Sequence, residues 1–179
     1  MAGVCVFCAS AQVLPAGYLD LARAAGTALA GAGHTVVSGG GRVGMMGALT
    51  GAARAAGGRT VGIVPQALVD REVADTGSDE LLVTADLADR KTLMLAKSDA
   101  FLVLPGGIGT LDELFEVWTT AALGLHGKPV LLLDHDGFYT GLLAWLDTLG
   151  AAGFLAGAAR DRLVVVDSLV TALGVLAAV

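Results

Sequence analysis

The chain is short of charged residues, prolines and cysteines, and each shortage excludes a class of protein. Charged residues make up 16% of the chain and hydrophobic residues 55%, whereas an average soluble domain has about 25% charged residues. Intrinsic disorder is therefore excluded. Only 4 prolines accompany 26 glycines, and the glycines follow no three-residue period, which excludes a collagen-like chain. The glycines are expected instead at turns and close backbone contacts.

The two cysteines, Cys5 and Cys8, have C-x-x-C spacing but lie in an apolar run over residues 4–8 that predicts a strand. Positions i and i+3 of a strand face opposite sides of the sheet. Since no second cysteine pair exists, we predict two buried thiols and no metal site. The histidines also lack metal-ligand spacing: His34, His126 and His135.

The charge balance argues against a nucleic-acid partner. Eleven basic and 17 acidic residues give a net charge of −6, whereas binding to phosphate backbones needs a basic face. The charge is uneven, because residues 1–69 hold one acidic residue and four arginines. A small anion is therefore expected to find a positive site in the first half of the chain.

Two long apolar stretches, residues 1–19 and 24–41, raise the question of a membrane segment. The first lacks a basic start and contains Gln12 and Pro15, and the second contains six glycines and His34. We predict no membrane segment and a soluble cytoplasmic protein.

Short β-rich runs alternate with longer helical segments, which predicts an α/β fold with a mainly parallel, doubly wound (Rossmann-like) sheet and helices on both faces. No linker is visible and the length suits one domain, residues 1–179. The segment 70–80 is acidic and predicts a surface loop. The predicted strands cover residues 4–8, 35–38, 60–64, 81–84, 100–104, 130–133 and 163–166. The predicted helices cover residues 18–32, 45–56, 87–97, 111–123, 141–149 and 169–176.

The first glycine-rich turn covers residues 38–47, between a predicted strand and a predicted helix. Gly39, Gly41 and Gly44 satisfy G-x-G-x-x-G, so backbone N–H groups and a helix N-terminus are available to hold a phosphate. A dinucleotide site also needs an acidic residue at the end of the next strand, where this chain has Pro65 and Gln66. The alternative is that the glycines only permit a tight turn and close helix packing.

The second glycine-rich turn covers residues 104–113 and opens the helix predicted over 111–123. It is not a Walker A loop, because no Gly-Lys-Ser/Thr follows. Glycine N–H groups, the Thr110 hydroxyl and the helix dipole together predict an anion site. Glu113 has two interpretations: Thr110 and Glu113 have the spacing of a capping box, or the carboxylate lies beside the sugar of a bound nucleotide.

Arg90 and Lys91 lie near the apolar stripe of the helix predicted over 87–97. This position indicates that the two cations point inward. The alternative is an ordinary surface ion pair between Asp86 and Arg90 at i, i+4.

These motifs together resemble the Lonely Guy (LOG) family of cytokinin riboside 5′-monophosphate phosphoribohydrolases. Residues 105–113 are similar to its P-G-G-x-G-T-x-x-E signature, and other blocks follow the family in order along nearly the whole chain. The similar blocks are residues 6–10, 39–47, 62–65, 85–91, 123–130 and 136–139.

The resemblance implies hydrolysis of the N-glycosidic bond of an adenine-type nucleoside 5′-monophosphate, without a cofactor or metal, by a homodimer or higher homo-oligomer. It implies that Arg90 and Glu113 are the catalytic pair. Some residues depart from the family pattern, which bears on the preferred base: Ala9, Leu87, Ala88, Ile108 and Asp112. The positions implied to contact substrate are Ser10, Gly40, Gly41, Met45, Glu72, Lys91, Gly106, Gly107, Ile108, Gly109, Thr110, Leu111, Asp112 and Thr119.

Three other classes of protein stay open at this stage. A dehydrogenase would need the ribose-binding acid that is missing here. A pyridoxal-phosphate decarboxylase would need a Schiff-base lysine, and the chain offers only Lys91, Lys97 and Lys128. A nucleotide carrier of similar fold would bind the nucleotide without turnover.

Overall fold

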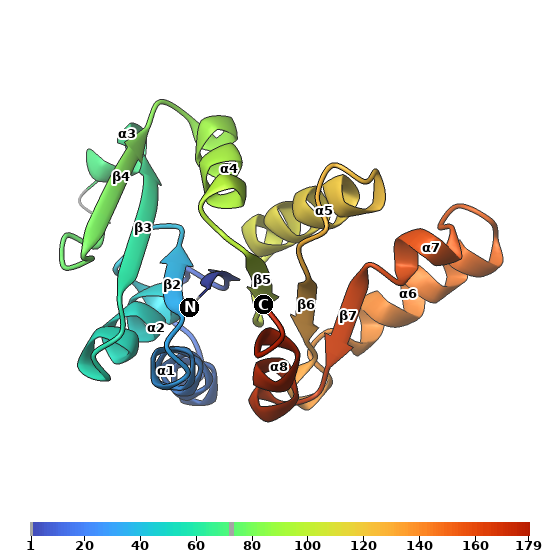
Figure 1. Ribbon diagram of the computed structural model, residues 1–179, viewed down its shortest axis with the longest axis horizontal. Coiled ribbons are helices and arrows are strands. Elements are labelled where there is room, and N and C mark those ends of the chain that lie inside the picture. Colours follow the sequence, from blue (N-terminus) through green and yellow to red (C-terminus); the bar gives the residue numbers. More distant parts are fainter. Residues whose placement is uncertain (1, 72–73) are drawn as a thin grey trace.

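The computed structural model describes residues 2–71 and 74–179 and contains a seven-stranded, fully parallel sheet (Figure 1). The strand order is β4-β3-β2-β1-β5-β6-β7, so the predicted fold class is confirmed. All seven predicted strands are present, with ends that differ by at most one residue. The strands are β1 (Gly3–Phe7), β2 (Thr35–Ser38), β3 (Thr60–Pro65), β4 (Glu80–Thr84), β5 (Ala100–Val103), β6 (Val130–Leu133) and β7 (Leu163–Val166).

The six predicted helices are also present. Two one-turn helices and one 3-10 turn were not predicted, because a single turn is too short to show helical periodicity. Within the described residues, no helix has the length and apolar character needed to span a bilayer. The helices are α1 (Ala16–Gly31), α2 (Gly44–Ala55), α3 (Gln66–Val69), α4 (Leu87–Ala96), α5 (Ile108–Ala122), α6 (Thr140–Ala151), α7 (Gly157–Arg160) and α8 (Leu169–Leu176), with the 3-10 turn η1 (His135–Gly137).

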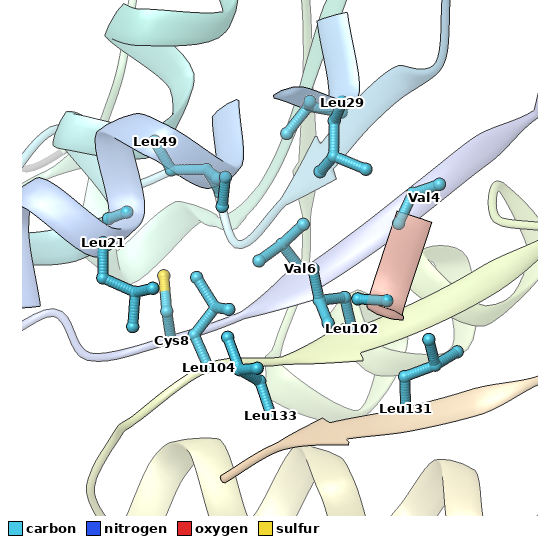
Figure 2. Packing of buried hydrophobic residues seen from close by; sticks show 14 of the residues in the cluster. Val4, Val6, Cys8, Leu21, Leu29, Leu49, Leu102, Leu104, Leu131 and Leu133 are labelled. Atoms are coloured by element: carbon cyan, nitrogen blue, oxygen red, sulfur yellow. The ribbon is translucent and has the colours of Figure 1, made fainter. Parts of the chain in front are cut away.

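Two apolar layers cover the two faces of the sheet. Helices α1, α2 and α8 form one layer, and α4, α5 and α6 form the other; Figure 1 shows α1 and α8 below the central strands and α4 and α5 above them. Cys5 belongs to the second layer and Cys8 to the first, where Figure 2 shows it in the same cluster as Leu21 and Leu104. Both thiols are free and buried, so the prediction of two buried thiols is confirmed.

The strand order reverses at β1, which has β2 on one side and β5 on the other. In an open parallel sheet, the connections that leave the carboxyl ends of two such strands diverge to opposite faces, which opens a crevice between them. Both glycine-rich turns follow strands next to β1, since residues 39–43 follow β2 and residues 104–107 follow β5. The topology therefore brings the two predicted anion-binding turns to one edge of the sheet.

Helices α1 and α2 cross closely at Gly26. A Cβ atom on Gly26 would lie 2.1 Å from the Leu49 carbonyl oxygen and 3.1 Å from the Ala53 nitrogen, both in the main chain of α2. Main-chain atoms inside a helix do not move aside easily, so the absence of a side chain at Gly26 sets the distance between the two helices.

We predict that Gly26→Ala lowers the free energy of unfolding by about 2–3 kcal/mol, because the added methyl overpacks the crossing. Gly17→Ala is the matched control, since Gly17 is in the exposed first turn of α1 with open space around it. Alanine is the better helix former, so this control should gain up to about 1 kcal/mol. Urea unfolding curves give the free energy of unfolding of each variant. Equal stability of the two variants would contradict the close crossing of α1 and α2.

Candidate active site

A cleft of about 560 Å³ lies at the carboxyl edge of the central strands. The loops after β1, β2, β3 and β5 contribute to its walls, together with the first turns of α4 and α5. Its lining includes Ser10, Gly39, Gly41, Met46, Val64, Leu68, Arg71, Leu87, Arg90, Lys91, Gly107, Ile108, Gly109, Thr110, Asp112 and Glu113.

The central feature of this cleft is an ion pair between Arg90 of α4 and Glu113 of α5. The guanidinium nitrogen Nη2 lies 3.0 Å from Glu113 Oε1, and the side chains are only 12% and 10% exposed. Arg90 Nε also donates a hydrogen bond to the Ile63 carbonyl oxygen at 3.1 Å. Arg90 therefore points inward, as its place near the apolar stripe predicted.

The alternative of a surface pair between Asp86 and Arg90 is wrong. Asp86 instead caps α4, where its carboxylate accepts a hydrogen bond from the Asp89 N–H at 2.8 Å. An N-cap carboxylate is a standard way to satisfy the first N–H groups of a helix. This leaves Arg90 available for a partner on a different helix.

The capping-box interpretation of Glu113 is also wrong. Helix α5 begins at Ile108 with Gly107 as its N-cap residue, and no described side chain caps that end. Thr110 therefore lies inside the first turn of α5 and not at the N-cap position. Gly109 is part of the helix despite the low helix propensity of glycine. The Glu113 carboxylate is free of any capping role and faces Arg90.

Burial raises the pKa of the Glu113 carboxyl above its usual value, and the Arg90 charge offsets part of that rise. Asp112 adds a further, smaller increase. A carboxyl group whose pKa is shifted by burial and by a specific cation inside a cleft is the kind of group that acid–base and electrostatic catalysis uses.

The start of α5, where no N-cap side chain forms a hydrogen bond, lies at one side of the cleft. The first helical hydrogen bond runs from the Leu111 N–H to the Gly107 carbonyl, so the N–H groups of the residues before Leu111 have no partner within the helix. Ile108 and Gly109 are exposed in the cleft lining. These donors and the positive end of the helix dipole suit a phosphate group.

The start of α2 is less open than the start of α5. The Met45 N–H donates to the Ala9 carbonyl at 3.0 Å, and the Met45 side chain is buried in the core beneath the cleft. Its neighbour Met46 lines the cleft instead. This turn packs against the loop after β1 and shapes the cleft wall.

The cleft brings together ten of the residues that the resemblance implied. They are Ser10, Gly41, Arg90, Lys91, Gly107, Ile108, Gly109, Thr110, Asp112 and Glu113. Gly40, Met45, Gly106, Leu111 and Thr119 lie outside its lining. Glu72 lies outside the described residues.

Met46, Val64, Leu68 and Leu87 form an apolar side of the cleft. Of these four, sequence reasoning singled out only Leu87, as a departure from the family pattern. The signal for Val64 was its place at the carboxyl end of a predicted strand, where ligands bind in parallel sheets. Leu68 belongs to the one-turn helix α3, for which the sequence held no comparable signal.

Lys91 forms a second charged group at the cleft edge. Its amino group pairs with Asp112 at 3.1 Å and with Glu116, and hydrogen bonds from Lys91 to Glu116 and Asp112 raise the pKa of Lys91. Lys91 therefore stays positively charged next to the Arg90–Glu113 pair. In the part of the chain that the structure describes, no group of three His, Cys, Asp or Glu side chains has the arrangement of a metal site.

The acidic segment 70–80 is anchored to the first glycine-rich turn by Asp75. The Asp75 N–H donates to the Gly40 carbonyl at 2.7 Å, and its carboxylate accepts hydrogen bonds from Thr50 and Arg54, each at 2.8 Å. The prediction of a surface loop is thus wrong for Asp75, which is buried. Burial would raise the pKa of Asp75, but the hydrogen bonds from Arg54 and Thr50 outweigh burial and lower it.

Known proteins similar to this chain cover most of its length. A family model described as "Possible lysine decarboxylase" matches residues 46–176. A Mycobacterium tuberculosis protein named cytokinin riboside 5′-monophosphate phosphoribohydrolase is 51% identical over 170 residues, which cover 95% of this chain and 90% of that protein. The chain belongs to the LOG family. An Arabidopsis thaliana member is 42% identical over 161 residues, which cover 90% of this chain and 75% of that protein.

A solved structure shares the fold of this chain. The molybdenum cofactor carrier protein from Chlamydomonas reinhardtii superposes with a TM-score of 0.74 at 21% identity, over 97% of this chain and 94% of that one. At this identity the likeness concerns the fold alone. LOG-type topology therefore occurs in carriers as well as in hydrolases.

A pyridoxal-phosphate decarboxylase would need a Schiff-base lysine, and the chain has three lysines. Lys91 pairs with acidic residues of α5, Lys97 lies 3.5 Å from Glu80, and Lys128 donates to the Leu95 carbonyl at 2.7 Å. Each of the three lysine amino groups already has a partner, and of the three only Lys91 lines the cleft.

We predict that Asp75→Asn lowers the free energy of unfolding by about 2 kcal/mol at neutral pH, because the half-buried Arg54 partner loses its counter-charge. The folded-state pKa of Asp75 is lowered, so its stabilisation is present above the ordinary Asp pKa and is lost as the pH falls through the lowered value. The wild type should therefore lose more stability than Asp75→Asn on acidification.

Urea unfolding at several pH values from about 7 down to about 2 measures this difference. Asp20→Asn is the matched control, since the Asp20–Arg23 pair is largely exposed and such pairs contribute little. Parallel stability curves for wild type and Asp75→Asn would contradict the anchoring role.

Proposed function

We propose that the chain hydrolyses the N-glycosidic bond of adenine-type nucleoside 5′-monophosphates and releases the free base and ribose 5-phosphate. The observation that carries the proposal is the buried Arg90–Glu113 pair beside the uncapped start of α5 in a single cleft. The names of the LOG relatives support the same reaction.

In this reaction the C1′–N bond breaks, positive charge develops on the ribose, and water adds its hydroxyl to C1′ while a proton goes to the departing base. A carboxylate beside the sugar stabilises that charge or takes a proton from the water, as in glycoside hydrolysis. We assign this role to Glu113. Arg90 orients the carboxylate and keeps part of its charge at neutral pH by lowering its pKa.

The 5′-phosphate is assigned to the start of α5, where Gly107, Ile108, Gly109 and Thr110 line the cleft. Binding energy at a group that does not react positions the sugar relative to Glu113. The purine is assigned to the apolar side formed by Met46, Val64, Leu68 and Leu87. An apolar substituent on the exocyclic amine suits such a wall better than a charged one.

We also propose a homodimer or higher homo-oligomer that works in the cytoplasm. Leu123 and Leu125, just after α5, are both more than half exposed, and exposed apolar side chains suit a subunit interface. Light scattering at micromolar concentration should give a mass at least twice that of the 17.9 kDa chain.

We predict that AMP or N6-isopentenyl-AMP is cleaved at least about 10²-fold faster than the matching riboside, because removal of the phosphate loses positioning energy. Chromatography of the free base after incubation with each compound measures the rates. Equal turnover of the riboside and the monophosphate would contradict the phosphate assignment. Binding of AMP without release of adenine would instead indicate a nucleotide carrier.

We predict that Glu113→Gln lowers turnover by a factor of about 10² or more, since the charge that stabilises the sugar is lost. The amide oxygen can still accept from Arg90 and no helix cap is lost, so the free energy of unfolding should change by only about 1 kcal/mol. Glu80→Gln, away from the cleft, is the control with normal turnover. A normal turnover rate in Glu113→Gln would contradict the catalytic role of Glu113.

The pH profile provides a further check on Glu113. The active form is the ionised carboxylate and its pKa is raised by burial, so kcat/KM should fall on acidification at a pH above the ordinary range of glutamate. That acid limb should be missing in the residual activity of Glu113→Gln. If kcat/KM falls at the same pH in both proteins, the acid limb belongs to another group.

A further inference from the structure

The guanidinium of Arg90 is enclosed on three sides. Glu113 Oε1 lies 3.0 Å from Nη2, and the Ile63 carbonyl accepts from Nε at 3.1 Å. The third side is Gly39, the first residue after β2. A Cβ atom on Gly39 would lie 1.9 Å from Arg90 Nη2 and 3.0 Å from Arg90 Cζ.

This contact, rather than the backbone conformation, explains the glycine at position 39. The φ angle of Gly39 lies outside the left-handed region that favours glycine, unlike that of Gly40 at +70°. The nearest atoms to the missing Cβ belong to the side chains of Arg90 and Met46 and not to the main chain. An alanine would therefore fit the backbone but would occupy the place of the guanidinium.

We propose that Gly39 is a positioning residue for catalysis: the space left by its missing side chain lets the Arg90 guanidinium reach Glu113 and Ile63 at the same time. The first glycine of the G-x-G-x-x-G turn thus makes room for the Arg90–Glu113 ion pair rather than binding a phosphate. The catalytic part of this inference rests on the proposed function, whereas the placement of Arg90 by Gly39 does not.

In Gly39→Ala the flexible end of Arg90 moves more easily than the main chain, so the guanidinium is displaced and the fold is kept. Glu113 then stays buried without its close cation. Since the Arg90 charge lowers the pKa of Glu113, the loss of that charge raises the pKa and leaves less carboxylate at neutral pH.

The activity test compares Gly39→Ala with Gly51→Ala. Gly51 lies in α2 with open space around its Cβ position and outside the cleft lining, so its replacement should leave kcat unchanged. Gly39→Ala should lower kcat about 10²-fold, as expected for a misplaced catalytic group. A kcat within about threefold of the wild type, together with an unchanged melting temperature, would overturn the proposal.

A second readout does not depend on activity. The chain has only four glutamates, so the carboxyl carbon of Glu113 can be followed by NMR in protein labelled with ¹³C-glutamate and assigned by its loss in Glu113→Gln. Its titration midpoint should move to higher pH in Gly39→Ala and in Arg90→Ala but not in Gly51→Ala. An unmoved midpoint in Gly39→Ala alone would overturn the proposal. A moved midpoint in a protein that hydrolyses no nucleotide would reject the proposed function and keep the placement of Arg90.

Combining Gly39→Ala with Arg90→Ala separates a displaced guanidinium from a damaged fold. With the guanidinium removed, Gly39→Ala should cause no further loss of activity or of melting temperature. A Gly39→Ala protein that unfolds, but folds again once Arg90→Ala is added, would support the contact with Arg90. Unfolding in both backgrounds would overturn the proposal, because the space at Gly39 would then be needed by something else.

Discussion

The site depends on one constraint: a carboxylate that is almost buried must have a cation within a few ångströms, or it takes up a proton instead of keeping its charge. Glu113 meets this constraint through Arg90, which comes from a different helix. Helix α4 follows β4 at one edge of the sheet, and α5 follows β5, which lies next to the central strand β1. The Ile63 carbonyl of β3 accepts a hydrogen bond from the arginine. The order of strands in the sheet therefore brings Arg90 to Glu113, and this contact favours the charged form of the Glu113 carboxylate.

The two glycine-rich turns near the cleft have different roles, because their neighbours differ. The start of α5 leaves N–H groups open to an anion because no described side chain caps it, whereas the turn after β2 is occupied by neighbouring protein groups. Asp75 binds the Gly40 carbonyl from one side and Arg90 fills the space next to Gly39 from the other. A glycine-rich turn between a strand and a helix is thus not by itself evidence for a phosphate, since close packing of protein atoms produces the same sequence pattern.

The fold was predictable because its signals are local and repeated. Short β-rich runs of four or five residues predicted all seven strands. Only the one-turn helices and the 3-10 turn were not predicted, since a single turn has no periodicity to detect. Two predictions about side-chain partners were wrong, and in both the predicted partners were close in sequence. Thr110 with Glu113, and Asp86 with Arg90, both had suitable spacing, but α5 starts before Thr110 and Asp86 caps its own helix. A tertiary partner displaced the local one in each case.

The sequence by itself determined the parallel α/β architecture, the burial of Cys5 and Cys8 on opposite layers, and membership of the LOG family, because each follows from residue periodicity or from motif order along the chain. Only the tertiary structure decided which charged side chains form ion pairs and which residues the glycines contact. Arg90, Gly39 and Glu113 are far apart in sequence and come from three different segments. Their contact depends on the order of strands in the sheet, which no spacing along the chain encodes.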